Sequence, residues 1–439
     1  MIDHRTLRVA LLGAGSVGSQ VARLLLEHAD ELEERAGARL ELAGIAVRNI
    51  DAQRDVDLPR ELLTTDASEL IVGSDIVIEL MGGIEPAKSY ILEALNSGAD
   101  VVTGNKALLA THGAEIFDAA DQVGASVSYE AAVAGAIPIV RPLKDSLAGD
   151  RVKRIFGIVN GSTNYILDRM DRDGLPADEA AQIASDLGFL EADPTLDVEG
   201  YDAAQKAAII ASLAFHTRVS IDDVHREGIT GVTAEMIESA SRAGYVIKLL
   251  AVCERLDATG DGHEESISVR VYPALISREH PLASVHGGNN AVFVEAEAAG
   301  SLMFYGAGAG GIETASAVMG DVVSAARRHI AGGVGVGESP RGQLPVAPIG
   351  RIITSYQIRL EVSDEPGVLE AIASILTEGG VSAAAVEQTA IPSDGQAARA
   401  QLVIGTHRAR EEALAATVER LAASDVVIRV ASVLRVEGE

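Results

Sequence analysis

Short apolar runs alternate with helical patterns along the N-terminal part of the chain. Residues 7–12, 40–47, 75–80 and 100–103 form such runs, and residues 21–26 carry an apolar helical pattern. A strand of a parallel sheet reads as a short continuous apolar run, because helices cover both faces of the sheet. The alternation therefore predicts an α/β fold built on a Rossmann-type, doubly wound parallel sheet.

The pattern changes after about Pro138, where longer helices and amphipathic strands replace the short apolar runs. This change predicts a separate α+β domain. Residues 331–350 are rich in glycine, proline and small polar residues without an apolar period, which is typical of a linker. The expected domains are 1–135 for dinucleotide binding (completed by about 306–330), 136–305 for substrate binding, catalysis and dimerisation, 331–350 as linker, and 351–439 as a C-terminal module.

The segment after the linker has an order of elements of its own. Strand and helix patterns follow one another as βαββαβ over residues 356–362, 366–377, 381–388, 400–405, 408–422 and 426–433. This order predicts a ferredoxin-like fold. The linker separates this module from the rest of the chain, so a chain cut after Ala331 is expected to keep a complete catalytic core.

The C-terminal module resembles the ACT domain, which binds amino acids across a pair of such modules. Its turn Asp364-Glu-Pro-Gly367 breaks the first strand and starts the first helix. The resemblance implies a feedback site with contacts from Asp364 and Gly367 and threonine as the expected effector. A small dimerisation domain without a ligand has the same fold and stays an alternative, because fold does not imply function.

Composition and charge narrow the classes of partner. Aromatic residues make up 3% of the 439 residues and tryptophan is absent, so the core must be built from Ala, Val, Ile and Leu. The formal net charge is −28, from 64 acidic against 36 basic residues. Nucleic acids and anionic membranes both require a basic surface, so this charge argues against either as a partner.

A single cysteine, Cys253, excludes an internal disulfide and fits a reducing compartment. It lies at the end of an apolar run, 246–252, which we interpret as a helix that buries the thiol in the core. The N-terminus has no signal-peptide pattern, and no uncharged apolar run is long enough to span a bilayer. We therefore expect a cytoplasmic protein.

The first apolar run leads directly into a Gly-x-Gly-x-x-Gly turn and then into a helical pattern. The dinucleotide-binding fingerprint requires this context, because Gly13 makes the turn, Gly15 lets the main chain approach a pyrophosphate and Gly18 packs helix on strand. Free N–H groups at the helix N-terminus bind phosphates. The predicted cofactor-binding residues here are Gly13, Ala14, Gly15, Ser16, Val17 and Gly18.

The second apolar run ends at Arg48 rather than at an acidic residue. An acidic side chain at this place hydrogen-bonds the ribose of NAD, whereas an arginine suits the 2′-phosphate of NADP. The sequence therefore predicts NADP, with NAD as the alternative cofactor and an ordinary surface arginine as the alternative role.

An acidic loop, residues 191–200, runs into an alanine-rich helical pattern that carries Asp202 and Lys206. Side chains four residues apart share one face of a helix, so the carboxylate and the amine should lie within reach of each other. A surface ion pair is the simpler interpretation. Lys206, however, is followed by Ala-Ala-Ile-Ile-Ala, so this helix enters a core. Burial there can lower the pKa of an amine until it exchanges protons.

Several stretches together resemble the homoserine dehydrogenase family. They are the fingerprint at 13–18, Thr103-Gly-Asn-Lys106, the segments 157–165 and 191–206, and the glycine-rich turn 306–308 before Thr314. They occur in the family's order and spacing over residues 1 to about 330. The resemblance implies NAD(P)-dependent interconversion of L-homoserine and L-aspartate 4-semialdehyde, in threonine, methionine and isoleucine biosynthesis, by a homodimer or homotetramer.

The resemblance also implies roles in the reaction. Lys206 would exchange the proton at the terminal oxygen of the substrate, with Asp202 beside it, because hydride leaves an alcohol carbon as the hydroxyl proton is removed. Glu191 would bind the substrate ammonium, assisted by Asp197.

Three further residues are implied at the cofactor. Thr103 and Lys106 follow a predicted strand, and the carboxyl ends of parallel strands face the ligand in such sheets. Gly308 would close over the cofactor from the second glycine-rich turn.

Residues 130–138 resemble the family's monovalent-cation loop. The implied ligands are Glu130, Val133, Gly135 and Ile137, with sodium as the expected cation. One carboxylate with several main-chain carbonyls makes an oxygen cage that suits sodium or potassium rather than zinc. The chain departs from the family pattern at Ala136, where a second glycine is usual, and at Gly104, where an alanine is usual.

Two other functions compete with this interpretation. A phosphorylating semialdehyde dehydrogenase shares the substrate but needs a thiolate nucleophile. The single cysteine, Cys253, is interpreted as a core residue and so would not supply one. A catalytically silent amino-acid sensor would keep the cofactor fold for structure alone. The intact pair of Asp202 and Lys206 argues against the sensor, and a turnover assay separates the two.

Overall fold

The computed structural model describes residues 5–190, 193–258, 264–332, 342–391 and 398–438. The chain forms two compact units. The first unit comprises residues 1–161, 202–224 and 288–344, and the second comprises residues 162–201, 225–287 and 345–439. No helix among the described residues is both long and apolar enough to cross a membrane.

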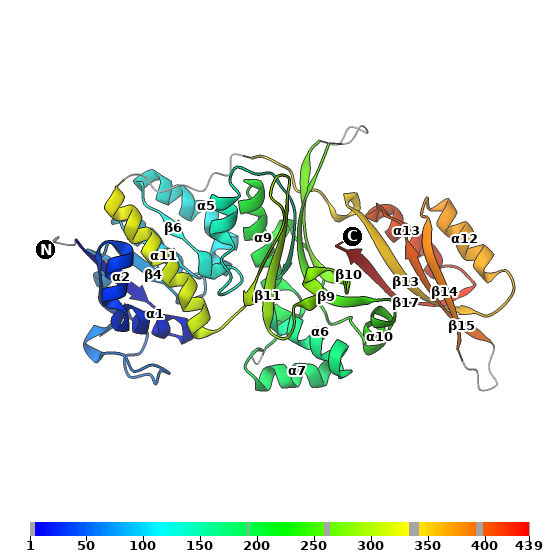
Figure 1. Cartoon of the computed structure of the whole chain (residues 1–439), viewed down its shortest axis with the longest axis horizontal. Coiled ribbons are helices and arrows are strands. Elements are labelled where there is room, and N and C mark those ends of the chain that lie inside the picture. The colour runs from blue at the N-terminus through cyan, green and yellow to red at the C-terminus, as the bar shows by residue number, and fades with distance from the viewer. Residues whose placement is uncertain (1–4, 191–192, 259–263, 333–341, 392–397, 439) are drawn as a thin grey trace. The chain divides into compact units, whose positions relative to one another are not determined.

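The first unit contains the predicted parallel sheet, drawn in blue to cyan in Figure 1. Its strands are β1 (Thr6–Leu12), β2 (Arg39–Ala46), β3 (Leu63–Thr64), β4 (Ile76–Glu79), β5 (Asp100–Thr103) and β6 (Val127–Ser128). They lie in the order β3-β2-β1-β4-β5-β6 and pair in parallel. The chain turns to opposite sides of β1 for β2 and β4, and this reversal opens a crevice at the carboxyl ends of the strands.

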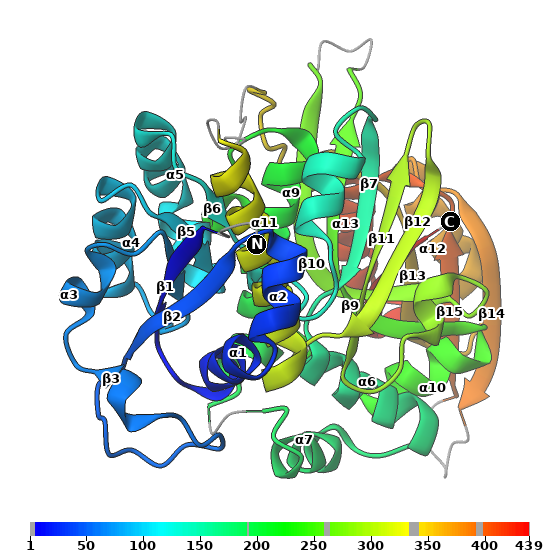
Figure 2. The ribbon, with the colours of Figure 1, turned by 60° about the vertical axis from the view of Figure 1, so that its left-hand side comes forward.

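Helices cover both faces of this sheet. They are α1 (Ser16–Glu27), α2 (Ala29–Ala36), α3 (Ala67–Ile71), α4 (Ala87–Asn96), α5 (Lys106–Val123) and, much later in the chain, α11 (Gly311–Ala331). Helices α1, α2 and α11 lie together against one face (Figure 2). Ala315, Val318 and Val322 of α11 are buried there among strand residues, so the last helix of the unit closes the core of its first strands.

Three antiparallel strands and a buried helix complete the first unit. They are β7 (Val152–Ile158), β11 (Asn289–Ala296), β12 (Gly300–Ala307) and α9 (Tyr201–Phe215). Alanine and isoleucine make α9 apolar on nearly every side, and most of its residues are buried, Asp202 and Lys206 among them. The expectation that this helix enters a core is confirmed.

The second unit begins with helices and a long hairpin. Its elements are α6 (Gly161–Asp173), α7 (Ala177–Asp186), α8 (Thr195–Val198), β8 (His225–Arg226), α10 (Ala234–Arg242), β9 (Tyr245–Leu256) and β10 (Ser266–Ser277). The helix expected over 246–252 is wrong, because β9 pairs with β10 along its whole length. An apolar run buried on both faces does not distinguish a strand from a buried helix. Cys253 is nevertheless a core residue, as expected.

The C-terminal segment has the predicted element order. It contains β13 (Ile353–Ser363), α12 (Val368–Glu378), β14 (Ala383–Ile391), β15 (Arg399–Thr406), β16 (Ala409–Arg410), α13 (Glu411–Ala422) and β17 (Val427–Glu437). The main strands lie in the order β17-β13-β15-β14, as in a ferredoxin-like fold. The helix expected from residue 408 begins at Glu411, because Ala409 and Arg410 first pair with β13.

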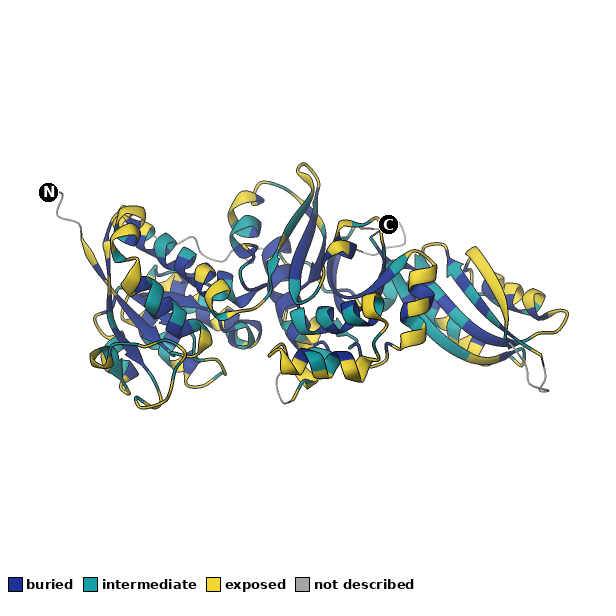
Figure 3. Ribbon diagram, turned by 60° about the horizontal axis from the view of Figure 1, so that its bottom comes forward, coloured by how far each residue is buried: buried dark blue, intermediate teal, exposed yellow. Residues whose placement is uncertain are grey.

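Exposure differs strongly among the strands of the second unit (Figure 3). Strands β9 and β10 are buried over most of their length, whereas β14 is exposed at nearly every position. β14 ends the strand order of the module, so its outer edge offers unpaired main-chain groups.

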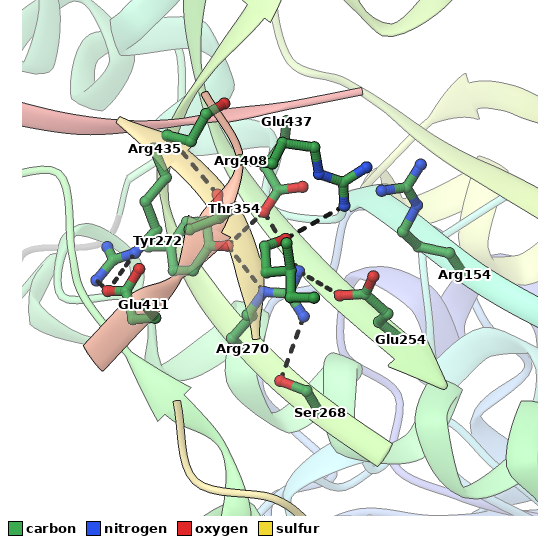
Figure 4. Close-up of polar contacts among 12 residues, drawn as sticks. Arg154, Glu254, Ser268, Arg270, Tyr272, Thr354, Arg408, Glu411, Arg435 and Glu437 are labelled. Carbon is green, nitrogen blue, oxygen red and sulfur yellow. Dashed lines mark hydrogen bonds and ion pairs between the residues drawn. The ribbon is translucent and has the colours of Figure 1, made fainter. Parts of the chain in front are cut away.

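A buried polar network joins the last strand to the hairpin (Figure 4). Arg270 of β10 is 1% exposed and donates to Glu254 at 2.7 Å and to the hydroxyl of Tyr272 at 2.8 Å. Tyr272 donates to Glu437 of β17 at 2.5 Å, and Arg270 lies 3.3 Å from the same carboxylate. Strand β17 also pairs in parallel with β10, from Ala274 onwards. The C-terminal segment is therefore held to β10 by strand pairing and by buried charge.

Residues 345–350 of the predicted linker are also bound to the second unit. The N–H of Ile267 donates to the carbonyl of Pro345 at 3.0 Å, and the N–H of Ala347 donates to the carbonyl of Ile267 at 2.7 Å. A short 3-10 turn, Ile349–Arg351, precedes β13. Residues 345–351 thus run along the unit rather than through solvent.

Candidate active site

The glycine turn after β1 has the geometry that the fingerprint predicts. Gly13 has φ +102° and its N–H donates to the carbonyl of Ala46 at 2.9 Å. A Cβ on Gly18 would overlap the carbonyl of Gly13, whereas a Cβ on Gly15 would meet no atom. Helix α1 begins at Ser16, and its Gly15 cap has no side chain to occupy the first N–H groups. The turn therefore offers an open surface and free donors to a phosphate group.

A pocket of about 850 Å³ opens beside this turn at the carboxyl ends of β1, β2 and β4. Its lining includes Gly13, Ala14 and Gly15, with Arg48 from the loop after β2. Ser16, Val17 and Gly18 follow in the first turn of α1. A nucleotide-sized space, a free helix N-terminus and an exposed arginine are the parts that a dinucleotide site requires. The residues that line this pocket and begin α1 therefore fit a dinucleotide cofactor.

Sequence reasoning missed Arg54, which also lines this pocket. Its guanidinium donates to the carbonyls of Asn49 at 2.7 Å and Ala52 at 2.9 Å. These bonds hold the loop that carries Arg48. No motif signals such a residue, because it binds main-chain groups of its own loop.

Thr103 lies at the end of β5, but its hydroxyl is occupied within the protein. It donates to Glu79 at 2.7 Å and accepts from the N–H of Asn105 at 3.0 Å. Glu79 is fully buried at the end of β4 and also accepts from the N–H of Met81 at 2.7 Å. The hydroxyl of Thr103 therefore fixes the ends of β4 and β5, so any contact of Thr103 with a cofactor would come from its main chain.

Three side chains converge on the carboxylate of Asp202. Lys206, one turn along α9, donates to Oδ2 at 2.8 Å, which confirms the predicted pairing. Lys106, the first residue of α5, lies 2.6 Å from Oδ1. Asn160, just beyond β7, donates to Oδ2 at 2.9 Å. Lys206 also donates to the carbonyl of Val159 at 2.6 Å.

The electrostatics of Asp202 follow from this arrangement. Burial alone would raise the pKa of its carboxyl group, but the ammonium groups of Lys206 and Lys106 hold that pKa far below its usual range. The carboxylate is therefore charged at neutral pH. Lys106 is the more accessible amine, with 39% of its side chain exposed against 11% for Lys206.

The arrangement can therefore transfer a proton and stabilise charge. A buried carboxylate holds two amines in place, one enclosed and one open to a ligand. Such a pair can donate a proton to a developing alkoxide or remove one from an alcohol.

The loop 130–137 is anchored differently from the expectation. Glu130 was expected to offer its carboxylate to a cation, but that carboxylate accepts the N–H groups of Ile139 at 2.6 Å and Val140 at 2.7 Å. It also accepts the main-chain N–H and Nε–H of Arg141, both at 3.0 Å. The Glu130 carboxylate is therefore a structural acceptor, and a cation could bind only its main-chain carbonyl, which also accepts the N–H of Val133 at 3.4 Å.

Main-chain carbonyls of this loop do fit a cation. Val133, Gly135 and Ile137 are buried, and within the described ranges no N–H group donates to their carbonyl oxygens. Ala134 and Gly135 both have positive φ, and Gly135 packs against Ala307 and Gly308 so closely that it has no room for a side chain. Buried carbonyl oxygens without donors are suitable ligands for a hard monovalent cation. Among the described residues, no cluster of His, Cys, Asp and Glu could hold another metal.

The other predicted site residues are placed as follows. Glu191 lies outside the described residues. Asp197 lies in α8, so the segment 191–200 is not irregular throughout as expected. Asp364 accepts from Gln388 of β14 at 3.1 Å, and Gly367 caps α12 with φ +97°. Asp364 and Gly367 are exposed.

Two family models match the chain: "Homoserine dehydrogenase, NAD binding domain" over residues 13–130 and "Homoserine dehydrogenase" over residues 138–323. A homoserine dehydrogenase of Mycobacterium tuberculosis is 53% identical over 99% of both chains. The chain belongs to the homoserine dehydrogenase family. It is therefore an oxidoreductase that acts on the CH–OH group of homoserine with a nicotinamide dinucleotide.

Solved structures of homoserine dehydrogenases share the fold. The enzyme of Thiobacillus denitrificans superimposes with a TM-score of 0.90 at 36% identity and covers 99% of both chains. A mutant of a hyperthermophilic archaeal homoserine dehydrogenase, solved in complex with NADPH, has a TM-score of 0.61 at 27% identity over 73% of this chain and 97% of its own.

The competing function as a phosphorylating dehydrogenase finds no support. Cys253 is 1% exposed on β9, and burial raises the pKa of its thiol to about 12. A buried thiol with such a pKa is not a nucleophile at neutral pH.

Proposed function

We propose that Lys206 is the proton donor and acceptor of this homoserine dehydrogenase, with Asp202 and Lys106 as its partners. The observation that carries the proposal is the buried carboxylate of Asp202, to which both amines bind. The ion pair stabilises the ammonium form of Lys206. In the direction of reduction, this ammonium donates its proton to the aldehyde oxygen of L-aspartate 4-semialdehyde as hydride reaches the carbon.

The reverse direction uses the same groups. Lys206 in its amine form removes the hydroxyl proton of L-homoserine as hydride leaves the adjacent carbon. The cofactor, when bound, supplies or accepts that hydride. Asp202 keeps the amine aimed at the substrate oxygen, and the charge of Lys106 stabilises the oxygen anion that develops between substrate and product.

The far end of the substrate carries an ammonium group, and acidic side chains are suited to bind it. We assign this contact to Glu191, assisted by Asp197. A charge-assisted hydrogen bond from the substrate would orient its reacting carbon toward Lys206.

The preferred cofactor is NADP, with NAD as the alternative. Arg48 lines the pocket beside the glycine turn, at the place where an arginine contacts a 2′-phosphate. The NADPH complex of the archaeal relative supports this preference. Gly13 and Gly15 would hold the pyrophosphate, Gly18 packs helix α1 on the turn, and Lys106 and Gly308 would lie toward the nicotinamide.

A monovalent cation, with sodium expected, binds the main-chain oxygens of Glu130, Val133, Gly135 and Ile137. The buried carbonyls of Val133, Gly135 and Ile137, to which no N–H group of the described residues donates, support this assignment. Its function would be to hold this loop against the turn at Gly308 rather than to take part in the chemistry.

The C-terminal segment is proposed to be an ACT-type regulatory domain of a cytoplasmic homo-oligomer. Its ferredoxin-like strand order and the open edge of β14 support this proposal, because an exposed edge strand is available to a second copy. The proposed contacts for threonine are Asp364, which accepts from Gln388 of that strand, and Gly367.

Steady-state oxidation of homoserine with NADP and with NAD, each with and without threonine, tests these assignments together. We expect turnover with a lower KM for NADP and inhibition by threonine. Turnover without any response to threonine, methionine, isoleucine or lysine would contradict the regulatory role and leave the module as an assembly domain.

A further inference from the structure

Asn290 is a fully buried asparagine whose side chain has no hydrogen-bond partner. It lies on β11 with 0% exposure, and neither its Oδ1 nor its Nδ2 has a partner among the described residues. Buried side-chain amides are nearly always hydrogen-bonded, because an unpaired donor or acceptor loses its water without compensation. An amide whose two polar atoms both lack a protein partner requires one from outside the protein, a ligand or an ordered water.

The strand register places Asn290 between the proposed proton donor and the second glycine-rich turn. Ala291 pairs with Ile158 of β7, so Asn290 is next in register to Val159. The carbonyl of Val159 accepts a hydrogen bond from Lys206. On the other side, Asn290 pairs with Gly306 of β12, where the chain enters the turn that leads to α11.

The side chain of Asn290 lies directly against that turn. A Cβ placed on Gly308 would overlap the amide group of Asn290, so only glycine can stand there. Gly310, two residues on, has φ +133°, a conformation that residues with a side chain rarely adopt. A turn built from glycines can change its path more easily than one with side chains, so this turn can shift at Gly308, where it lies against the amide.

The unmatched atoms also indicate which group completes the site. Oδ1 requires a donor and Nδ2 requires an acceptor, side by side. The hydroxyl of homoserine donates and accepts through a single oxygen, and its carboxylate and ammonium are charged groups, which charged partners bind better than a neutral amide does. The carboxamide of a nicotinamide ring offers one donor and one acceptor in the same plane, which matches an asparagine amide.

We propose that Asn290 binds the carboxamide of the nicotinamide ring, with the turn at Gly308 moving aside as the cofactor enters. This inference rests on the proposed placement of the cofactor at that turn. Two hydrogen bonds to the carboxamide fix the rotation of the ring about its glycosidic bond and so present one of its faces to the substrate. Asn290 is thus a cofactor-binding residue that also positions the hydride.

The test compares NADP with its 3-acetylpyridine analogue, which keeps the carbonyl but lacks the N–H donor. Asn290→Leu has nearly the same shape and cannot make either hydrogen bond. We expect kcat/KM with NADP to fall roughly 10- to 100-fold in this variant, since each lost bond contributes about tenfold. The loss with the analogue should be clearly smaller, because one of the two bonds is already missing there.

A second readout does not depend on turnover. The rise in melting temperature caused by NADP should shrink in Asn290→Leu, while the melting temperature without cofactor should not fall, because an unpaired buried amide has been replaced by an apolar group. Asn289→Leu, at the neighbouring position of the same strand, is the control and should keep the wild-type discrimination between the two cofactors. Asn290→Asp, which keeps the size but loses the donor, serves if the leucine variant does not fold.

Equal losses with NADP and the analogue, or an unchanged NADP-dependent melting shift, would overturn the assignment of Asn290. Failure of the wild-type protein to oxidise homoserine would instead contradict the proposed function. In that case the melting shift still decides whether Asn290 binds the cofactor.

Discussion

Asp202 is the residue on which the proposed chemistry depends. Its pairing with Lys206 is local, since both lie on α9 one turn apart, and the spacing alone predicts it. Lys106 and Asn160 come from other elements, and only the folded chain brings them to the same carboxylate. Three donors around one buried carboxylate explain why burial does not neutralise it.

Removal of the proposed proton donor should abolish most of the activity without affecting the cofactor. We expect Lys206→Ala to lower kcat by about two to four orders of magnitude while NADPH still binds, because proton transfer is lost and the cofactor pocket is not. Steady-state kinetics and NADPH titration measure the two effects. Lys88→Ala removes a lysine that is paired with Glu115 and serves as the control, with kcat and NADPH binding like those of the wild type.

Near-wild-type turnover of Lys206→Ala would refute the assigned role. Asp202→Asn should be impaired as well, since the amide no longer holds two ammonium groups. If that variant behaves like the wild type, the pair is only a helix salt bridge.

The burial of Lys248 predicts how the stability of the protein depends on pH. It is buried on β9 and donates to Asn164 at 2.9 Å and to the carbonyl of Val285 at 2.7 Å. Burial lowers the pKa of Lys248 from 10.5 to about 8, although Asp168 acts in the opposite direction. Between these two values the unfolded chain binds more protons than the folded protein, so the contribution of Lys248 to stability rises with pH.

The advantage of the wild type over Lys248→Met should therefore grow by up to about 3 kcal/mol between pH 7 and pH 10.5. Urea denaturation across this range measures the difference. Lys153→Met, at an exposed lysine, should show no such pH dependence. A constant difference for Lys248→Met would mean that this amine titrates normally.

At the scale of elements, sequence patterns predicted the parallel sheet and the C-terminal βαββαβ order well. The four predicted strands of the first sheet are short, mostly apolar runs that end at glycine or polar residues, so their boundaries are visible, whereas the two-residue strands β3 and β6 are too short to give a pattern. The same rule failed for β9, because its apolar run is buried on both sides and has no distinct period. Strand pairing with β10 decided that element.

A substitution in the loop after β2 tests the proposed preference for NADP over NAD. Arg48→Ala should weaken NADP more than NAD, by about tenfold in KM, because only NADP presents a 2′-phosphate to the guanidinium. Kinetics with both cofactors measure the ratio. Arg60→Ala removes an exposed arginine paired with Asp51 on the same loop and is the control. Equal losses for both cofactors would make Arg48 a structural residue.

At the scale of the whole molecule, the C-terminal segment is less independent than its linker suggested. Sequence reasoning expected that a chain cut after Ala331 would keep a complete catalytic core. In the second unit, however, β17 pairs with β10, and Glu437 binds the buried Arg270 (Figure 4). A cut at the linker would uncover a buried guanidinium and a strand edge.

We therefore expect the truncated chain to be less stable than the full chain, because the edge of β10 loses its strand partner and Arg270 loses one of its carboxylate partners. Thermal melting of the truncated and full-length chains measures this. Glu437→Gln should show a smaller loss, whereas Glu378→Gln, which removes an exposed ion pair with Arg420, should change stability by less than about 1 kcal/mol. A truncated chain as stable as the full one would restore the modular view.

Regulation is better tested in the full chain, where Asp364→Ala should reduce inhibition by threonine and leave turnover unchanged.

The sequence by itself determined the local features of this protein: the glycine turn after β1, the pairing of Asp202 with Lys206, the alternation of the first sheet and the family. Each depends on residues close together in the chain, whose spacing is fixed by the period of a helix or strand. Tertiary structure decided what depends on distant residues. It brought Lys106 and Asn160 to Asp202, and it committed the carboxylate of Glu130 to main-chain donors. It also left the amide of Asn290 buried without a partner and bound β17 to β10, because burial and hydrogen bonding are settled only when separate segments meet.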